Sequence, residues 1–220
     1  MILKQWVSKF PHHCVAILIV LTLAGYMGGV YYFAYQARKQ AAYDKAQSFL
    51  ESIIGMHQYY SSEIVPRIKA SGGKFKMEYA DEADVFPYPA AVSIDLGRVL
   101  KKVNQHLDTK IYSEFPFPIR RGRTLDRFEQ ESLVALKQNS AVDFVKFETR
   151  DGIEYVRYAR AMTMRADCVA CHNRPDFGFQ GRWKLGDFRG AQQVSMPVPA
   201  MAAIIDSATY TAIFFAILAS

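Results

Sequence analysis

Apolar residues form an unbroken run close to the start of the chain. No Lys, Arg, Asp or Glu occurs between Phe10 and Ala37, and residues 15–35 are almost entirely apolar. At about 1.5 Å of rise per residue, a helix over this run reaches roughly 30 Å, the thickness of the hydrocarbon core of a bilayer. The pattern therefore predicts a transmembrane helix over residues 15–35, after a short N-terminal segment of residues 1–14.

A cleaved signal peptide is the alternative interpretation of this run. Lys4 and Lys9 would form its basic leader. The run is longer than the core of a usual signal peptide, however, and no small-x-small cleavage site follows it cleanly. We therefore favour a membrane anchor.

A second apolar segment ends the sequence. Residues 197–220 carry a single charge, Asp206. Because a carboxylate at the centre of a bilayer costs about 2.5–3.5 kcal/mol on insertion scales, Asp206 is expected near a membrane surface. We predict a second transmembrane helix within residues 199–220, either incomplete or continued in a longer protein.

Helical spacing persists after the first apolar run. Apolar positions recur every three or four residues from Ala42 to Ile64, and His57 falls on the same stripe. We predict a membrane-proximal helix within residues 36–70 that ends before Pro66, because proline fits poorly inside a helix.

The next part of the chain, residues 71–198, alternates short helical and strand-like stretches. Asp151-Gly152 between the strand-like runs 142–149 and 153–161 is the strongest short signal for a β-hairpin. Helices are expected after Ser93 and after a Thr124 cap, and strands at 75–79, 111–115 and 192–198. Together these elements predict an α+β fold, a PAS- or Cache-like antiparallel sheet with a long N-terminal helix, flanked by transmembrane helices.

A motif directly after the predicted hairpin carries recognisable chemistry. Cys168-Val169-Ala170-Cys171-His172 is the C-x-x-C-H signature of c-type haem attachment. In such sites thioether bonds join both cysteines to the haem vinyl groups, and the adjacent histidine binds iron as the proximal ligand. We predict one covalently attached haem c, held by Cys168, Cys171 and His172.

Zinc and dithiol chemistry fit this motif less well. A structural zinc site needs four Cys or His ligands, usually from a second C-x-x-C or an H-x-x-x-H pair, and the sequence has neither. A thioredoxin-like dithiol lies beside a βαβ unit, whereas this motif follows a hairpin.

The haem motif also orients the chain. Basic residues flank the first apolar run on both sides, so they do not orient it. Because haem c is attached outside the cytoplasmic membrane, we predict an inner-membrane protein with residues 1–14 in the cytoplasm and residues 71–198 in the periplasm. The net charge of +6 then does not indicate nucleic acid as a partner.

Several stretches between residues 45 and 198 resemble the haem-c-binding, PAS-like periplasmic sensor domains that precede bacterial adenylate or guanylate cyclases, histidine kinases and chemoreceptors. The matching stretches are Tyr59–Val65, Phe115–Pro118 with Arg120, Leu125–Glu129, the haem motif with Asn173, and Trp183–Asp187 with Arg189-Gly190. The resemblance implies a membrane-bound haem sensor that signals through the second span to a cytoplasmic output domain.

His57 is our candidate for the sixth iron ligand, because a haem packed on the membrane-proximal helix would meet its apolar stripe. An ordinary core histidine is the alternative, and a vacant or water-filled position is another. Further candidate ligands are His106, Met56, Met77, Met162 and Met164. Arg120, Arg121 and Arg123 are candidate partners for the haem propionates, and Phe115, Phe117 and Trp183 are candidate pocket walls.

The sequence thus predicts a membrane-anchored monohaem c-type sensor domain that detects redox state or a small diatomic ligand. The alternative is a monohaem electron-transfer protein or a haem subunit of a membrane respiratory complex. We do not predict an enzyme, because no acid–base constellation accompanies the motif. Expected partners are haem, the lipid membrane, an output domain or respiratory complex, and a second copy of the chain through Gly25 and Gly29, a G-x-x-x-G pair.

Overall fold

The structure is a computed structural model that describes residues 12–77, 79–117, 122–174 and 181–200. It divides into two compact units: one comprises residues up to 41 together with those from 199 on, and the other comprises residues 42–198. Helix α2 (His12–Tyr59) begins in the first unit and ends in the second. The predictions for residues 1–11 and for Asp206 and the rest of 201–220 lie outside the described residues.

The first unit contains the apolar part of α2. Its large apolar side chains between Ile17 and Phe33 are 46–72% exposed. Among the described residues, one helical stretch, 13–70, is long and apolar enough to cross a membrane. A continuous exposed apolar surface of this kind is typical of a helix that lies in a bilayer, and a membrane anchor and a signal sequence both have one.

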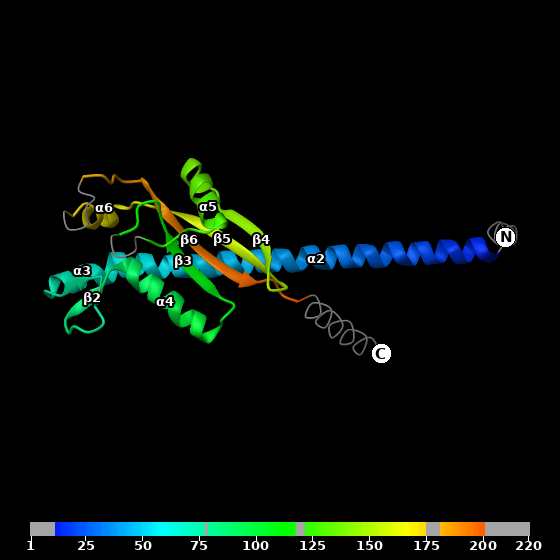
Figure 1. Ribbon diagram of the computed structural model, residues 1–220, viewed down its shortest axis with the longest axis horizontal. Helices are drawn as coiled ribbons and strands as arrows, with labels where there is room; N and C mark the ends of the chain where they lie inside the picture. Colours follow the sequence, from blue (N-terminus) through cyan, green and yellow to red (C-terminus); the bar gives the residue numbers. More distant parts are fainter. Residues whose placement is uncertain (1–11, 78, 118–121, 175–180, 201–220) are drawn as a thin grey trace. The chain divides into compact units, whose positions relative to one another are not determined.

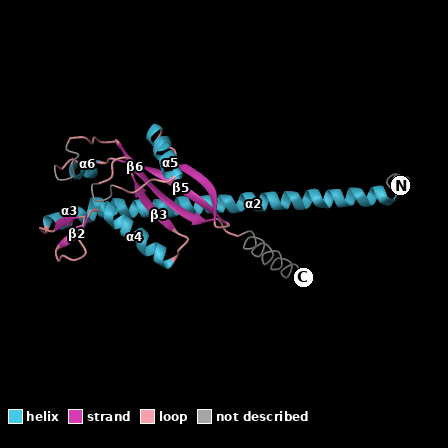
Figure 2. Cartoon of the chain, viewed as in Figure 1, coloured by secondary structure: helices cyan, strands magenta, loops and turns pink. Residues whose placement is uncertain are grey.

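A four-stranded antiparallel sheet forms the centre of the second unit (Figure 2). Its strand order is β3-β6-β5-β4, and the strands are β3 (Asp108–Tyr112), β4 (Phe144–Arg150), β5 (Ile153–Thr163) and β6 (Phe188–Pro197). β4 and β5 form the predicted hairpin. Asp151 and Gly152, both with positive φ (50° and 76°), make its two-residue turn. The α+β fold with a long N-terminal helix and an antiparallel sheet is therefore confirmed.

Each face of the sheet packs against a helix (Figure 1). On one face α2 places Ala42, Ala46 and Leu50 against side chains of β5 and β6 that include Tyr158 and Val194. On the other face α5 (Arg127–Gln138) contributes a second cluster, whose members are Phe128, Leu133 and Leu136. Neighbouring residues of a strand point to opposite faces, so each core strand serves both clusters.

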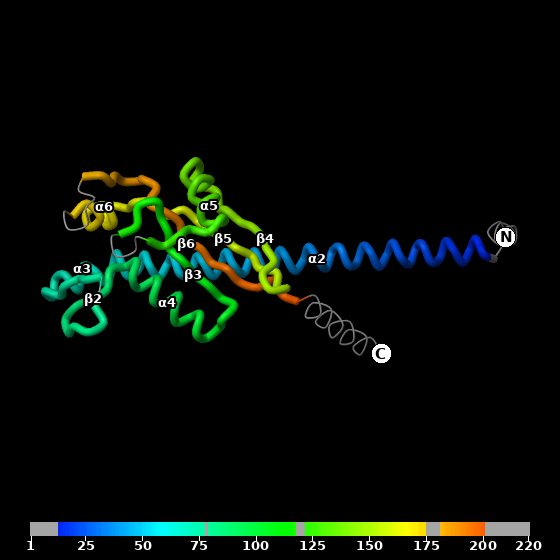
Figure 3. Tube along the Cα trace, viewed as in Figure 1, coloured from blue at the N-terminus to red at the C-terminus, as the bar shows by residue number. Residues whose placement is uncertain are grey.

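The prediction that the membrane-proximal helix ends before Pro66 is wrong. α2 continues directly into the π-helix η1 (Tyr60–Ile64) and then into α3 (Val65–Ala70), and the chain trace is unbroken through this region (Figure 3). Pro66 lies in the first turn of α3. The backbone hydrogen bonds change to the i→i+5 pattern in η1, so Pro66 lies at the start of a new helical segment. Proline is tolerated there because the first N–H groups of a helix have no carbonyl partner within it.

Two predicted helix starts are also corrected. α4 (Pro89–Val103) begins at Pro89 rather than after Ser93, because proline suits the first turn of a helix. α5 is capped by Asp126 rather than Thr124. The Asp126 carboxylate accepts from the Glu129 backbone N–H at 2.9 Å, and the Glu129 carboxylate accepts from the Asp126 N–H at 3.1 Å, which forms a capping box.

The remaining elements are short. β1 (Lys74–Lys76) and β2 (Val85–Pro87) form a parallel pair, and α6 (Ala166–His172) follows β5. The strands expected at 75–79, 111–115 and 192–198 correspond to β1, β3 and β6, with shifted ends.

Replacing Asp126 with alanine is expected to lower the free energy of unfolding by about 2 kcal/mol. The change removes the cap of α5 and the carboxylate that accepts from the buried Arg157 at 2.9 Å. Burial raises the pKa of Asp126, but the hydrogen bond from Arg157 and the Glu129 backbone outweigh it and hold this pKa below its usual value of 3.8. The stabilisation should therefore be present at neutral pH and vanish as the pH falls below about 4.

Thermal unfolding of the full chain in detergent, followed by circular dichroism, measures this effect. Lys137→Ala is the matched control, since it removes an exposed ion pair with Glu114 from the other end of α5. Its expected effect is within about 0.5 kcal/mol. Equal effects of the two substitutions would contradict the role given to Asp126.

Candidate functional site

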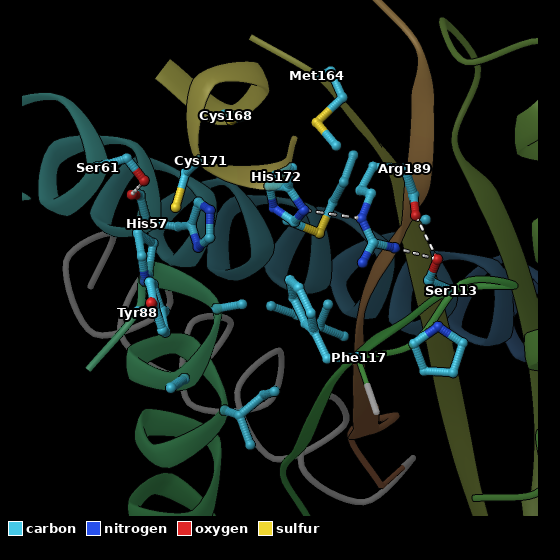
Figure 4. A pocket seen from close by; sticks show the side chains of 18 of the residues that line it. His57, Ser61, Tyr88, Ser113, Phe117, Met164, Cys168, Cys171, His172 and Arg189 are labelled. Atoms are coloured by element: carbon cyan, nitrogen blue, oxygen red, sulfur yellow. Dashed lines mark hydrogen bonds between the residues drawn. The ribbon is translucent and has the colours of Figure 1, made fainter. Parts of the chain in front are cut away.

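A cavity of about 440 Å³ lies in the second unit, where α2, α4, α6 and the ends of β3, β5 and β6 meet (Figure 4). This volume is within the range usual for cofactor and small-molecule sites. Its lining includes His57, Ser61, Tyr88, Phe117, Met162, Met164, Cys168, Cys171, His172 and Arg189. The pairing of β5 with β6 shifts register between Met162 and Thr163, at the cavity and just before the chain enters α6.

The C-x-x-C-H motif forms most of α6. Helical spacing of three and four residues places Cys168, Cys171 and His172 on one side of this short helix. The end of α6 is held by Asn173, whose side chain donates to the Trp183 carbonyl at 2.8 Å and accepts from the Trp183 N–H at 3.0 Å. Burial raises the pKa of the Cys168 thiol, so this thiol is protonated at neutral pH.

His172 lies against an aromatic ring and a guanidinium group. Its imidazole stacks on Phe117, with ring centroids 5.3 Å apart and planes 27° apart. Arg189 Nε lies 3.5 Å from His172 Nδ1. Burial, and next the positive charge of Arg189, lower the pKa of His172 to about 4. The imidazole is therefore neutral at pH 7, the form that binds transition metals.

His57 reaches the same cavity from the last turn of α2 (Figure 4). Its Nδ1 lies 3.0 Å from Ser93 Oγ on α4. Burial, and then the charge of Arg165, lower its pKa to about 4, so this imidazole is neutral as well. His57 and His172 therefore line one cavity, although they come from α2 and α6.

Basic side chains outnumber acidic ones around the cavity. Lys69, Arg123, Arg174 and Arg189 line it, against Glu114 and Asp167. Arg189 donates to Ser113 Oγ and lies over the rings of Phe117 and Trp183, at 5.4 and 5.1 Å. Burial and the nearby Arg182 lower its pKa to about 10, which still leaves it charged at neutral pH. The cavity therefore favours an anionic group beside its apolar walls.

The structure brings most of the sequence-predicted site residues together. His57, Cys168, Cys171 and His172 all line the cavity, and so do Met77, Met162, Met164, Phe117 and Arg123. His106 and Met56 are absent from the lining, and His106 instead pairs with the Tyr155 hydroxyl at 2.9 Å. Phe115 and Trp183 contact each other edge to face next to this region. Arg120 and Arg121 lie outside the described residues.

Sequence reasoning gave no site role to Arg189 or Ser93. Arg189 belonged to a stretch that resembles haem sensors, without a function of its own, and Ser93 was expected at a helix start. Arg123, a predicted propionate partner, forms an ion pair with the buried Glu129. No local pattern identifies Arg189 or Ser93, because β6 brings Arg189 to the cavity and α4 brings Ser93 against His57 only in the folded domain.

The cavity is not a preformed metal cluster. Within the described ranges, no three His, Cys, Asp or Glu side chains are grouped closely enough to hold a metal ion. Two neutral imidazoles, two thiols and a basic lining instead surround a space large enough for an organic cofactor.

The chain is similar to a protein of known structure and matches a family model. Among solved structures, it is similar to the crystal structure of the cyanobacterial heme-protein Tll0287, with 18% sequence identity and a TM-score of 0.44, over 67% of this chain and 89% of that chain. No curated protein matches the chain. A family model described as Tll0287-like matches residues 35–197, well over half of the sequence. The chain therefore belongs to the Tll0287-like family.

Proposed function

We propose that residues 42–198 bind one haem c, joined covalently to Cys168 and Cys171, with His172 and His57 as the two axial ligands of the iron. The observation that carries this proposal is the convergence of His57 with the C-x-x-C-H motif at one cavity. These groups come from α2 and α6, which are far apart in the sequence. Membership of a family typified by a protein described as a heme protein supports it.

The residues fit each part of a haem. Neutral imidazoles suit iron, and two thiols separated by two residues suit the vinyl groups. Aromatic and thioether side chains, among them Phe117 and Met164, suit the faces of the macrocycle, and Arg189 suits a propionate. All of these side chains line the same cavity.

Haem would supply a one-electron iron couple at this site, and the side chains would set its behaviour. His57 and His172 would be the two protein ligands of the iron. Arg189 would stabilise the reduced iron, because a buried positive charge disfavours the extra charge of the ferric state. Burial of the cavity would keep bulk water from the macrocycle.

We further propose that this domain is a periplasmic redox sensor, anchored in the inner membrane by the apolar part of α2. His57 lies on the same helix as the apolar segment, so a change in its bond to iron acts directly on that helix. Two protein ligands favour redox sensing over the binding of a diatomic gas. They also suit electron transfer, which is the second candidate, and neither role is catalytic.

The haem can be tested on the full chain, produced together with a haem c maturation system and purified in detergent. The intact mass is expected to rise by one haem. The absorption spectrum should be six-coordinate and low-spin in both oxidation states, and in the ferrous form it should change only at carbon monoxide concentrations high enough to displace the sixth ligand. An unmodified mass would contradict covalent attachment.

Sensing can be separated from electron transfer with spin labels on exposed positions of α2 and β4. A change in their distance between the oxidised and reduced forms is expected for a sensor. Identical distances in the two forms would contradict sensing and leave electron transfer as the function.

A further inference from the structure

Ser93 contacts the imidazole of His57 from the first half of α4. Its hydroxyl oxygen lies 3.0 Å from His57 Nδ1, and the residue is only 2% exposed. α4 itself is held close to the sheet, because a Cβ atom on Gly97 would lie 2.4 Å from Thr109 Oγ1 on β3. The position of Ser93 relative to the cavity is therefore set by backbone packing.

The hydrogen bonds around Ser93 show which ring nitrogen of His57 carries the proton. The Ser93 hydroxyl donates to the Pro89 carbonyl at 3.4 Å, which leaves its lone pairs to accept. Because a hydroxyl has a single proton, and that of Ser93 is directed to the Pro89 carbonyl, Nδ1 must be the donor in its contact with Ser93 Oγ. Nδ1 thus carries the proton, and Nε2 is the ring nitrogen with a free electron pair.

We propose that Ser93 is a positioning residue that holds His57 in the tautomer and orientation able to bind iron through Nε2. The inference rests on the proposed role of His57 as an axial ligand. Histidine ligands of metals commonly donate their second ring N–H to an oxygen of the protein, and this outer contact sets the ring orientation and the strength of the ligand.

A second buried serine provides a matched control. Ser132 on α5 is fully buried, and its hydroxyl donates to the Glu129 carbonyl at 2.9 Å. It is absent from the cavity lining and has no contact with His57, whereas Ser93 contacts the ring. Loss of the Ser132 hydroxyl should disturb local packing to a similar degree while the bond to Nδ1 remains.

The test measures the carbon monoxide affinity of the ferrous, haem-loaded full chain, because carbon monoxide competes with the sixth ligand. Ser93→Ala is expected to raise this affinity about tenfold, the lower end of the usual cost of losing an outer contact. Ser93→Thr, which keeps the hydroxyl, and Ser132→Ala should each stay within about twofold of the parent. Thermal unfolding checks that each variant folds, and Ser93→Cys replaces Ser93→Ala if the latter does not.

The same measurements in a His57→Ala background separate the possible failures. Ser93→Ala should have no further effect there, because the residue it positions is gone. Equal effects in both backgrounds, an effect of Ser132→Ala as large as that of Ser93→Ala, or no effect of Ser93→Ala would each overturn the positioning role while His57 remains the ligand. A spectrum that His57→Ala leaves unchanged would overturn the proposed ligand itself.

Discussion

Replacing His57 with alanine is expected to convert a haem that binds carbon monoxide weakly into one that binds it readily. The apparent affinity for carbon monoxide is the intrinsic affinity multiplied by the fraction of molecules in which His57 has left the iron. If His57 occupies the axial position in about 99% of molecules, its removal raises the affinity about 100-fold. The ferrous spectrum should change from six-coordinate low-spin to high-spin, because the substitution leaves a space beside the iron that water fills poorly.

His106→Ala is the control for this experiment. His106 is half-buried and hydrogen-bonded to Tyr155, as a core histidine would be, and it is absent from the cavity lining. Its spectrum and carbon monoxide affinity should match those of the parent protein. A His57→Ala protein that remains six-coordinate and unreactive would remove His57 from the iron, and the cavity-lining Met77, Met162 and Met164 would become the ligands to test.

The chemistry of α6 could be predicted from sequence because it is local. The three residues of the C-x-x-C-H motif lie within one turn and a half of helix, so their spacing alone places them together. His57 could be proposed because helical periodicity placed it on the stripe that Ala42 and Ala46 bury against the sheet. The hydrogen bond between His57 and Ser93 could not be predicted, since it depends on how α4 packs against β3.

The difference between local patterns and contacts made on folding also explains which parts of the fold could be predicted. The β4–β5 hairpin was predictable because Asp151 and Gly152 have the conformational freedom that a two-residue turn requires. The helix boundaries were less predictable from the sequence. Pro66 is tolerated because η1 changes the hydrogen-bond pattern just before it, and Asp126 displaces Thr124 as the cap because Glu129 and Arg157 both bind its carboxylate. These choices depend on contacts made after the chain has folded.

Replacing Cys168 and Cys171 together with alanine is expected to abolish covalent attachment of haem completely. Haem staining of the chain on a denaturing gel should fall from full intensity to none, because each thioether bond requires a cysteine sulfur. Each single substitution should leave one bond and a weaker but visible band. Neither half-buried cysteine is joined in a disulfide, so the substitutions break no covalent cross-link.

Cys14→Ala is the matched control, because Cys14 is exposed on α2 and is absent from the cavity lining. Its haem staining should equal that of the parent. In the double variant, His172 and His57 still line the cavity, so haem added to the purified protein should bind and then be extracted by acidic organic solvent. Haem that survives the denaturing gel in the double variant would contradict attachment at α6. Failure to bind added haem would show that the two imidazoles do not suffice without the thioether bonds.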